Sequence, residues 1–341
     1  MKQKKVTFAD IAAYTGFSKT TISRYFNNPD SLTLENQEKI AHALDVLGYQ
    51  ENKLAKVLAN GKSEFVGIII PNLYLHYYSE MLNQLLSTYE KYNYKFLVFI
   101  GNNKKEIEEK YIHELMAYKI EGLIVLSNTI SSEELASYKL PVVTIERECD
   151  HVCSVSTDNY LGGVQATSLL IRNNCDVILH INSIFPDTLP TYGRIRGFED
   201  ICNEHHVVHE LIQRNLGNTY QETLTQLKNI FNEIEEKYPS QKKGVFLAND
   251  TYASMFLNLI FQKYGKLPKD YQIVGFDDSP IASEAILPIT TVGQQIEKIA
   301  QTAMELLVLQ MNEMKKRKPA PLKEPVHKQI TPVLIRRNTT D

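Results

Sequence analysis

Polar and basic side chains gather in the short segment that begins at Ser18. If residues 19–27 are helical, one face of the helix carries these hydrogen-bonding side chains: Lys19, Thr20, Ser23, Arg24 and Asn27. Lysine and arginine donate to the acceptors of guanine, and hydroxyl groups bond to several base edges. Ser18 is a suitable N-cap, and a capped helix N-terminus can approach a phosphate. The segment therefore has the chemistry of a helix that lies in the major groove of DNA.

Two further predicted helices position this segment. Thr7 and Asp10 have the [ST]-x-x-[DE] spacing of a capping box, and Gly16 ends the helix that they begin. Helical spacing places four residues on one face of that helix: Phe8, Ile11, Ala12 and Thr15. A third helix is predicted over residues 33–47, ahead of Gly48. The first 50 residues thus read as a three-helix helix-turn-helix headpiece, although a solvated helical hairpin fits residues 7–28 equally well.

The distribution of charge favours DNA binding by this end of the chain. The chain has 341 residues and a net charge of −3, so it is not a uniformly basic protein. Residues 1–62 hold nine Lys or Arg and six Asp or Glu, a balance of +3, and the remainder has a balance of −6. A basic end on an acidic body is expected when only that end meets phosphate.

The cysteines and histidines give little sign of a disulfide framework or a metal site. The four cysteines are scattered, and neither Cys149–Cys153 nor the histidines within 204–209 have a recognised zinc spacing. We expect 204–209 to be a solvated helix end and loop, and we expect no metal or cofactor. Because no apolar segment has the length of a signal peptide or a membrane span, we expect a cytoplasmic protein without a membrane partner.

From residue 65 onward, apolar runs alternate with amphipathic helical stretches. Seven strands are predicted: 65–70, 95–100, 122–127, 141–146, 176–181, 244–249 and 271–276. Strands that alternate with helices form parallel sheets covered on both faces. About 280 residues of this pattern exceed a comfortable single sheet, so we predict two α/β lobes with a ligand crevice between them.

Several predicted strands end in polar residues at one rim of this crevice. Glu146 and Arg147 end one strand, and Asn249 and Asp277 end or follow two others. Arg194 follows a further strand, and Tyr77 and Tyr78 lie beyond the first strand. Carboxylates, amides and arginine around aromatic rings suit a polyhydroxylated ligand. For any single residue, a strand-end cap or a surface ion pair is an equally good interpretation.

The motifs together resemble the lactose/galactose repressor (LacI/GalR) family over essentially the whole chain. The strongest match is residues 6–72, from VTFADIAAYTGFSKTTISRYFNN through the predicted hinge to FVGIIIPN. Shorter matches follow: VSTDNYLGG, RIRGF, LAND, IVGFDDSPIA, LPITTVGQ and RNTT. The resemblance implies a headpiece at 1–50, a hinge helix at 51–62 and a periplasmic-binding-protein-like body at 63–341. We expect the N-lobe at about 63–160 and 293–325, and the C-lobe at about 161–292 and 326–341.

The resemblance also assigns roles to single residues. It implies base contacts from Lys19, Thr20 and Arg24. It implies phosphate contacts, direct or through orientation, from five others: Thr7, Ser18, Thr21, Ser23 and Asn27. Leu58 matches the hinge leucine that wedges between base pairs in the minor groove. In the body it implies effector contacts from Tyr77, Tyr78, Glu146, Arg147, Arg194, Asn249 and Asp277.

Two departures from the family pattern affect these expectations. The family usually has a proline soon after the third helix, whereas this chain has Gln50-Glu51-Asn52, which loosens the start of the hinge and adds a negative charge near DNA. The chain also has no tryptophan, so stacking on a ligand must come from tyrosine, phenylalanine or an aliphatic side chain.

The sequence therefore predicts a homodimeric transcriptional repressor of a carbohydrate-utilisation operon. It would bind a pseudo-palindromic operator under control of a sugar, sugar phosphate or sugar acid, either as inducer or as corepressor. We expect a dimer because no heptad tail follows the last strand.

A solute-binding protein and a sugar- or nucleotide-processing enzyme are the alternatives. The basic N-terminus argues against the first and the lack of a phosphate-binding or nucleophile motif against the second, so we expect no enzyme. The basic run 315–318 reads as a solvated helix end rather than a second DNA contact.

Overall fold

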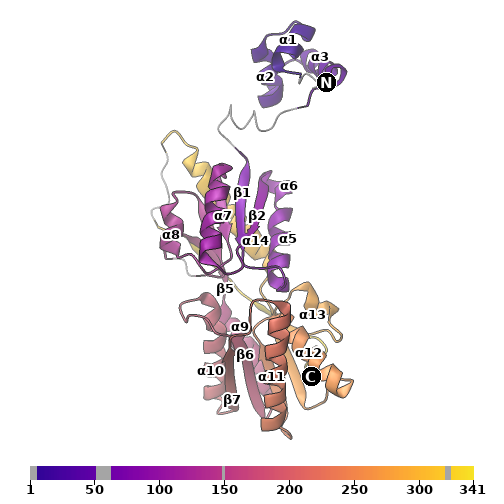
Figure 1. Cartoon of the computed structure of the whole chain (residues 1–341), viewed down its shortest axis with the longest axis vertical. Coiled ribbons are helices and arrows are strands. Elements are labelled where there is room, and N and C mark those ends of the chain that lie inside the picture. The colour runs from indigo at the N-terminus through magenta and orange to yellow at the C-terminus, as the bar shows by residue number, and fades with distance from the viewer. Residues whose placement is uncertain (1–5, 51–62, 148–149, 319–323) are drawn as a thin grey trace. The chain divides into compact units, whose positions relative to one another are not determined.

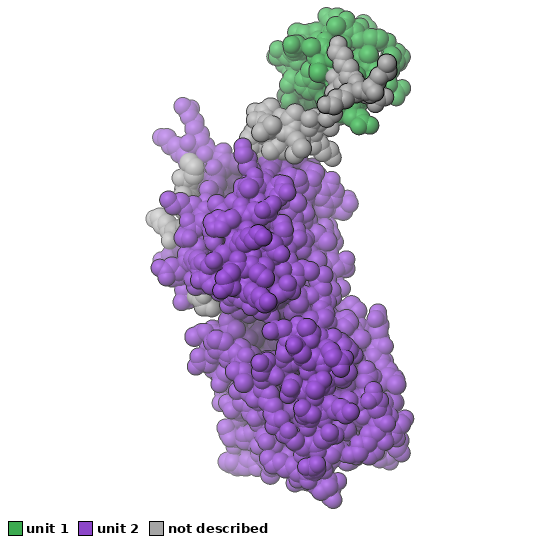
Figure 2. Space-filling model, viewed as in Figure 1, with its two compact units in different colours: residues 1–62 green, residues 63–341 purple. Residues whose placement is uncertain are grey.

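The computed structural model describes residues 6–50, 63–147, 150–318 and 324–341. The chain forms two compact units, Met1–Lys62 and Ser63–Asp341, which are coloured separately in Figure 2. We call the first unit the headpiece and the second unit the body, and we describe each by itself. The predicted hinge, 51–62, lies outside the described residues.

The headpiece is a bundle of three short helices around a small apolar core. It contains α1 (Phe8–Thr15), α2 (Lys19–Asn27), the 3-10 turn η1 (Pro29–Ser31) and α3 (Leu34–Leu47) (Figure 1). The fully buried residues come from all three helices: Ile11, Ile22, Ile40 and Ala43. The ring of Phe8 stacks on the ring of Phe26 with centroids 5.2 Å apart, which ties α1 to α2.

The helix ends of the headpiece have the caps that the sequence predicts. The carboxylate of Asp10 accepts a hydrogen bond from the backbone N–H of Thr7 at 2.8 Å. Gly16 ends α1 with a φ of 74°, a left-handed conformation that favours glycine. The Oγ of Ser18 accepts from the backbone N–H of Thr21 at 3.1 Å, so α2 begins at Lys19 as expected.

The body contains two six-stranded sheets, one in each lobe. The N-lobe sheet has the order β11-β5-β4-β3-β1-β2, and all neighbouring strands are parallel. Its strands are β1 (Phe65–Ile70), β2 (Lys95–Ile100), β3 (Gly122–Val125), β4 (Val142–Ile145), β5 (Cys153–Thr157) and β11 (His327–Ile330). Helices α5 (His76–Ser87) and α14 (Ile296–Met314) cover one face, and α7 (Lys105–Ala117) and α8 (Ser132–Ser137) cover the other. The short α6 (Tyr89–Tyr92) precedes β2.

The C-lobe sheet has the order β12-β10-β9-β8-β6-β7 and is parallel except for β12, which runs antiparallel to β10. Its strands are β6 (Val177–Ser183), β7 (Val208–Arg214), β8 (Lys243–Leu247), β9 (Tyr271–Asp277), β10 (Thr290–Gly293) and β12 (Val333–Ile335). Helices α9 (Asn159–Arg172) and α10 (Gly193–Glu204) cover one face, with the 3-10 turn η2 (Pro190–Tyr192) ahead of α10. Helices α11 (Tyr220–Lys237) and α12 (Asp250–Tyr264) cover the other face, and α13 (Pro280–Glu284) follows β9.

The seven predicted strands are all present, with ends within two residues of the predicted bounds. Five strands were not predicted: β5, β7, β10, β11 and β12. Most of these are short or contain polar residues, so they lack the apolar run that marks a buried strand. The prediction of a loop at 204–209 is partly wrong, because His209 lies within β7.

The predicted boundary between the lobes near residue 326 is also wrong. Strand β11 pairs in parallel with β5 of the N-lobe sheet, so the chain returns to the C-lobe only between Ile330 and Val333. The sequence HKQI has three consecutive polar residues and no helix after it, so nothing in it indicated which sheet it joins. Within the described part of the chain, no helix is both long and apolar enough to cross a bilayer.

Candidate functional site

The outward face of α2 presents the predicted DNA-contacting side chains to solvent. Lys19, Thr20, Arg24 and Asn27 are exposed, and so are Ser18 and Thr7 beside them; Thr21 and Ser23 are half-buried. Neither Lys19 nor Arg24 forms an ion pair with any described residue, so both cationic groups are available to an external partner. The structure therefore brings eight of the nine predicted DNA-binding residues to one small unit. The ninth, Leu58, lies outside the described residues.

The inward face of α2 fixes the direction of the outward face. Ile22 is fully buried, and Tyr25 and Phe26 pack against the same core. The Nδ2 of Asn27 donates to the backbone carbonyl of Ser23 at 3.0 Å, which orients that amide along the helix. Rotation of α2 about its axis would expose these apolar groups, so the polar face has a defined orientation.

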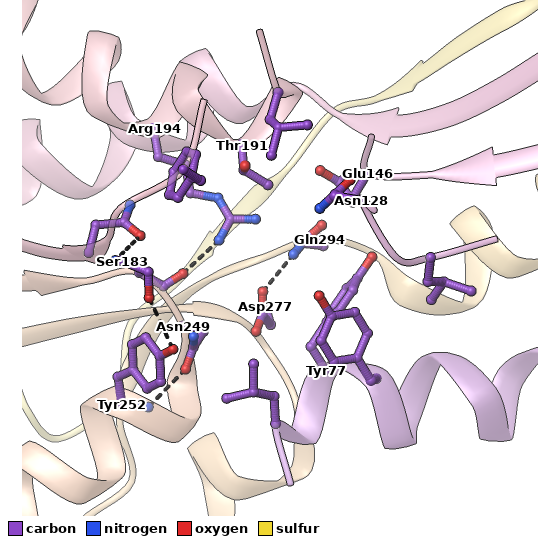
Figure 3. Close-up of a pocket in the computed structure, with 17 residues that line it drawn as sticks. Tyr77, Asn128, Glu146, Ser183, Thr191, Arg194, Asn249, Tyr252, Asp277 and Gln294 are labelled. Carbon is purple, nitrogen blue, oxygen red and sulfur yellow. Dashed lines mark hydrogen bonds between the residues drawn. The ribbon is translucent and has the colours of Figure 1, made fainter. Parts of the chain in front are cut away.

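A second candidate site is a pocket in the body, between the two lobes (Figure 3). Its volume is about 190 Å³, far above the roughly 10–15 Å³ that one water requires, so it is large enough for a small molecule. The residues that line it come from both lobes: Leu75, Tyr77, Tyr78, Leu126, Asn128, Glu146, Asn182, Ser183, Phe185, Leu189, Thr191, Arg194, Ala248, Asn249, Tyr252, Asp277 and Gln294. Many of them end or follow strands, as the carboxyl-end rule for parallel sheets predicts.

Six of the seven predicted effector-binding residues line this pocket: Tyr77, Tyr78, Glu146, Arg194, Asn249 and Asp277. The seventh, Arg147, does not line the pocket, so a ligand contact by this residue stays a prediction. Its side chain is 2% exposed, and its guanidinium donates to the backbone carbonyls of Ser127 and Ile130. Because Glu146 has a φ of 54°, the chain turns sharply after β4, and Glu146 lines the pocket while Arg147 does not.

Arg194 is the one cationic side chain that lines the pocket among the described residues. Its Nε donates to Oδ1 of Asn159 at 2.7 Å, and its Nη1 donates to the carbonyl of Ala248 at 2.6 Å. The guanidinium carbon lies 3.6 Å from the centroid of the Phe276 ring, a close cation–π contact. These contacts hold Arg194 in place before any ligand arrives.

Glu146 is linked to Arg194 through an amide. The Nδ2 of Asn159 donates to Glu146 at 2.8 Å, while the Oδ1 of the same amide accepts from Arg194. The backbone N–H of Thr157 also donates to Glu146. Burial raises the pKa of the Glu146 carboxyl, although the charge of Arg194 opposes this shift.

Asp277 lies at the end of β9 in the C-lobe, and an amide holds its carboxyl group as well. The Nε2 of Gln294 donates to Oδ1 of Asp277 at 2.5 Å, and the Oε1 of Gln294 accepts from the Thr157 hydroxyl at 2.7 Å. Burial raises the pKa of Asp277 well above its ordinary value, with the charge of Arg194 acting in the opposite direction. The φ of Asp277 is 111°, an uncommon conformation for a residue with a side chain.

Two tyrosines of α5 form another part of the pocket wall. The rings of Tyr77 and Tyr78 meet edge to face with centroids 5.4 Å apart. The hydroxyl of Tyr77 is buried and has no hydrogen-bond partner among the described residues. Since a buried hydroxyl without a partner costs free energy, the Tyr77 hydroxyl is a candidate contact for a ligand group. Burial raises the pKa of both tyrosines, so both are neutral donors at physiological pH.

Asn249 caps α12 and supports a further tyrosine. Its Oδ1 accepts from the backbone N–H of Tyr252 at 2.8 Å, and the Tyr252 hydroxyl lies 3.3 Å from Oγ of Ser183.

On strand β6, the amide Nδ2 of Asn182 lies 3.2 Å from Nε2 of His180. Burial lowers the pKa of His180 to about 3, so this imidazole is neutral.

Sequence reasoning missed eleven lining residues: Leu75, Leu126, Asn128, Asn182, Ser183, Phe185, Leu189, Thr191, Ala248, Tyr252 and Gln294. Gln294 and Ala248 lie inside motifs that the sequence had already singled out, LPITTVGQ and LAND. Tyr252 lies in the first turn of α12, and the others lie in loops, in the turn η2 or at strand ends that carry no motif. Among the described residues, no group of three or more His, Cys, Asp or Glu could hold a metal ion.

Two family models match the chain, one in each unit. The model described as bacterial regulatory proteins of the lacI family matches residues 7–52, which contain the helix-turn-helix. The model described as a periplasmic binding protein-like domain matches residues 168–340, about half of the chain. The two matches follow the order headpiece and then body.

Curated relatives and solved structures match over most of the chain. The sucrose operon repressor of Streptococcus mutans is 26% identical over 303 residues, 88% of this chain and 91% of the relative. The ribose operon repressor of Bacillus subtilis is 25% identical over 305 residues, 89% of this chain and 90% of the relative. The lac repressor dimer bound to operator matches with a TM-score of 0.81 and 21% identity, over 99% of both chains. A regulator from Alkaliphilus metalliredigens in complex with D-xylulofuranose matches with a TM-score of 0.69 and 26% identity, over 82% of this chain and all of that chain.

Proposed function

The chain belongs to the LacI/GalR family of DNA-binding transcriptional regulators, and from this membership we propose that it represses a carbohydrate-utilisation operon in response to a small sugar. The observation that carries the proposal is the combination of two sites in one chain. The headpiece presents cations that pair with no described residue on a helix of the right size for the major groove, and the body encloses a polar and aromatic pocket. The protein then acts by binding DNA in the cytoplasm and not as an enzyme.

In this proposal the headpiece binds DNA through α2. Lys19, Thr20 and Arg24 contact base edges, because they are exposed on the outward face. Thr7, Ser18, Thr21, Ser23 and Asn27 contact or orient phosphates, since their groups lie near the N-termini of α1 and α2 or beside the recognition face. Leu58 is assigned by resemblance alone to the minor-groove wedge.

A homodimer supplies two headpieces for a pseudo-palindromic operator. The edge strand β2 offers a surface for the second copy. None of its residues is fully covered, and the neighbouring Leu86 and Tyr89 are exposed. An uncovered edge strand beside exposed apolar side chains is typical of an interface. The variant Leu86→Glu should shift the protein toward monomer in light scattering coupled to size exclusion.

The chemistry of the pocket favours an uncharged sugar over a sugar phosphate or sugar acid. Arg194 is the only cation on the pocket wall among the described residues, and two of its nitrogens already bond to Asn159 and Ala248. Glu146 and Asp277 are carboxyls on the same wall. A phosphate or carboxylate is usually bound by charge-assisted hydrogen bonds from more than one cation, and the described part of this wall provides only Arg194. Hydroxyl groups can instead accept from Tyr77 and donate to the two carboxyls.

The experiment that tests the proposal has two steps. The purified full chain is first used to select duplexes from a random DNA pool, which should yield a two-fold symmetric site. Thermal shift is then measured with matched pairs: D-ribose and ribose 5-phosphate, D-glucose and glucose 6-phosphate or gluconate, and sucrose. An uncharged sugar at about 100 times its Kd should stabilise the folded chain by about 2.7 kcal/mol.

The same sugar should change the affinity for the selected duplex, in either direction, by a coupling free energy of about 1–3 kcal/mol. Stronger stabilisation by a charged member of a pair would overturn the assignment of an uncharged ligand. Failure to enrich any DNA site would overturn the assignment of a repressor. Consumption of any sugar by the protein would indicate an enzyme instead.

A further inference from the structure

The loop that follows β3 places one exposed amide in the pocket wall between tightly held neighbours. Asn128 is exposed and lines the pocket, and it lies near Glu146 in Figure 3. The residue before it, Ser127, is fully buried, and Ile130 is 1% exposed. Because Ser127 and Ile130 are buried while Asn128 is exposed, the loop can present the Asn128 side chain with little freedom of its backbone.

Glu108 holds this loop from one side. It lies on α7 and is fully buried, which is rare for a glutamate. One carboxyl oxygen, Oε2, accepts from the hydroxyls of both Ser127 and Thr129, the two residues that flank Asn128. Gly101 makes room for this side chain, because a Cβ at that position would lie 2.3 Å from Cγ of Glu108.

Arg147 holds the backbone of the same loop from the other side. One terminal nitrogen donates to the carbonyl of Ser127 and the other donates to the carbonyl of Ile130. A planar guanidinium can bridge two acceptors in this way with two separate nitrogens, whereas an ammonium group has all its donors on one nitrogen. The pocket residue Glu146 is its immediate neighbour in the chain, so the same turn after β4 positions Glu146 and the loop of Asn128.

We propose that Glu108 and Arg147 are positioning residues that fix the loop 126–130, so that Asn128 presents its amide to a hydroxyl of the bound sugar. The inference rests on the proposed function for the nature of the ligand. Both side chains bond to residues on either side of Asn128 rather than to Asn128 itself, which leaves that amide available as a donor and an acceptor. Buried ionisable groups contribute little to stability on their own account, and conformational specificity is the role that fits this pair.

The first test needs no ligand. Hydrogen exchange of the full-length protein is followed by mass spectrometry in peptides that cover 126–131. The variants Glu108→Ala and Arg147→Met should raise exchange in these peptides by about tenfold, because each removes two hydrogen bonds from the loop. Glu108→Gln retains an acceptor oxygen and should restore most of the protection.

Lys243→Met is the matched control, because Lys243 is also a buried cation that donates to a carbonyl, that of Gln241, but it lies in the C-lobe. It should leave the exchange of 126–131 unchanged. Equal exchange in all variants, or an equal rise in the control, would overturn the holding of the loop by Glu108 and Arg147.

The second test measures affinity with four uncharged probes, sucrose, D-ribose, cellobiose and D-xylulose, by calorimetry. Arg147→Met and Asn128→Ala should each weaken binding of the probe that the wild type binds, by about three- to tenfold. In the background of Asn128→Ala, Arg147→Met should have no further effect, because its contribution acts through that amide.

Additive losses in the double variant would overturn the positioning role. A wild-type protein that binds none of the four probes would overturn the proposed ligand class, and with it the ligand contact of Asn128. Hydrogen exchange decides the holding of the loop independently of that result.

Discussion

The two candidate sites place their polar groups in opposite environments. On α2 of the headpiece, Lys19 and Arg24 are exposed, and no ionisable residue of the described headpiece is buried. In the pocket of the body, Glu146, Arg194 and Asp277 are all less than 10% exposed and are bonded to amides or carbonyls. The cationic side chains of α2 therefore form charged contacts only when DNA binds, whereas the pocket side chains are already held in place before a ligand binds. This difference predicts opposite effects on stability and binding when similar residues are changed in the two sites.

The largest expected effect comes from removing the buried cation of the pocket. Arg194→Met should destabilise the body by about 3–5 kcal/mol, because it leaves Asn159 and the Ala248 carbonyl without a donor and removes the charge that opposes the two carboxyls. Urea unfolding followed by circular dichroism measures this change. Arg196→Met is the control, since Arg196 lies two residues along α10 and is exposed; its effect should stay within about 0.5 kcal/mol. An equal effect of the two variants would contradict the role of Arg194 in organising the pocket.

The matching change in the headpiece should separate stability from binding. Arg24→Ala should leave the free energy of unfolding within about 0.5 kcal/mol, because its guanidinium is solvated and has no described ion-pair partner. It should weaken binding to the selected operator by about 1–3 kcal/mol and relax the base preference at one position. Fluorescence anisotropy with operator and scrambled duplexes measures both. An unchanged ratio between the two duplexes would show that Arg24 does not read a base.

The same difference explains what the sequence could predict. Local rules are sufficient for the headpiece, since spacing, the cap at Ser18 and the turn at Gly16 all lie within 20 residues and agree with one another. The pocket is assembled from loops far apart in the chain, so residues such as Asn128 and Phe185 carry no local signal. Arg147 shows the limit most clearly. It follows Glu146 directly, and only the backbone turn at Glu146 decides that the glutamate, and not the arginine, lines the pocket.

A smaller effect is expected at the N-cap of α2. Ser18→Ala removes the acceptor for the backbone N–H of Thr21 and should destabilise the headpiece by about 1 kcal/mol. Binding to non-specific DNA should weaken as well if Ser18 also orients a phosphate. Ser18→Asp restores the cap but adds a negative charge, so it should recover the stability and not the DNA affinity. Recovery of both by Ser18→Asp would contradict a phosphate contact near this residue.

The buried carboxyls should make the stability of the body depend on pH. Burial raises the pKa of Asp250 to about 7, above its value in the unfolded chain, so the folded state binds the proton more readily. Its contribution is most favourable at low pH and is lost as the pH rises through about 7. From pH 8 to 6.5 the body should gain up to about 1 kcal/mol, measured by urea unfolding.

The variant Asp250→Asn should flatten this trend. His180 acts in the opposite sense, because its pKa is lowered to about 3, and it costs stability only as the pH falls below about 6.5. The window from pH 8 to 6.5 therefore isolates the carboxyls. A body that loses stability on acidification across this window would contradict the raised pKa of Asp250.

The smallest effect is expected at Tyr77. It tests whether a buried hydroxyl that contacts the ligand lowers the stability of the protein without ligand. The buried Tyr77 hydroxyl has no partner among the described residues, so Tyr77→Phe should leave the body unchanged or stabilise it by up to about 1 kcal/mol. Affinity for the bound sugar should fall, because the substitution removes a neutral donor that faces the ligand. Tyr92→Phe is a control, since that hydroxyl lies near Glu305 on the surface. A stability that rises while affinity falls is the outcome expected of a binding group, whereas a loss of both would show that the hydroxyl supports the fold.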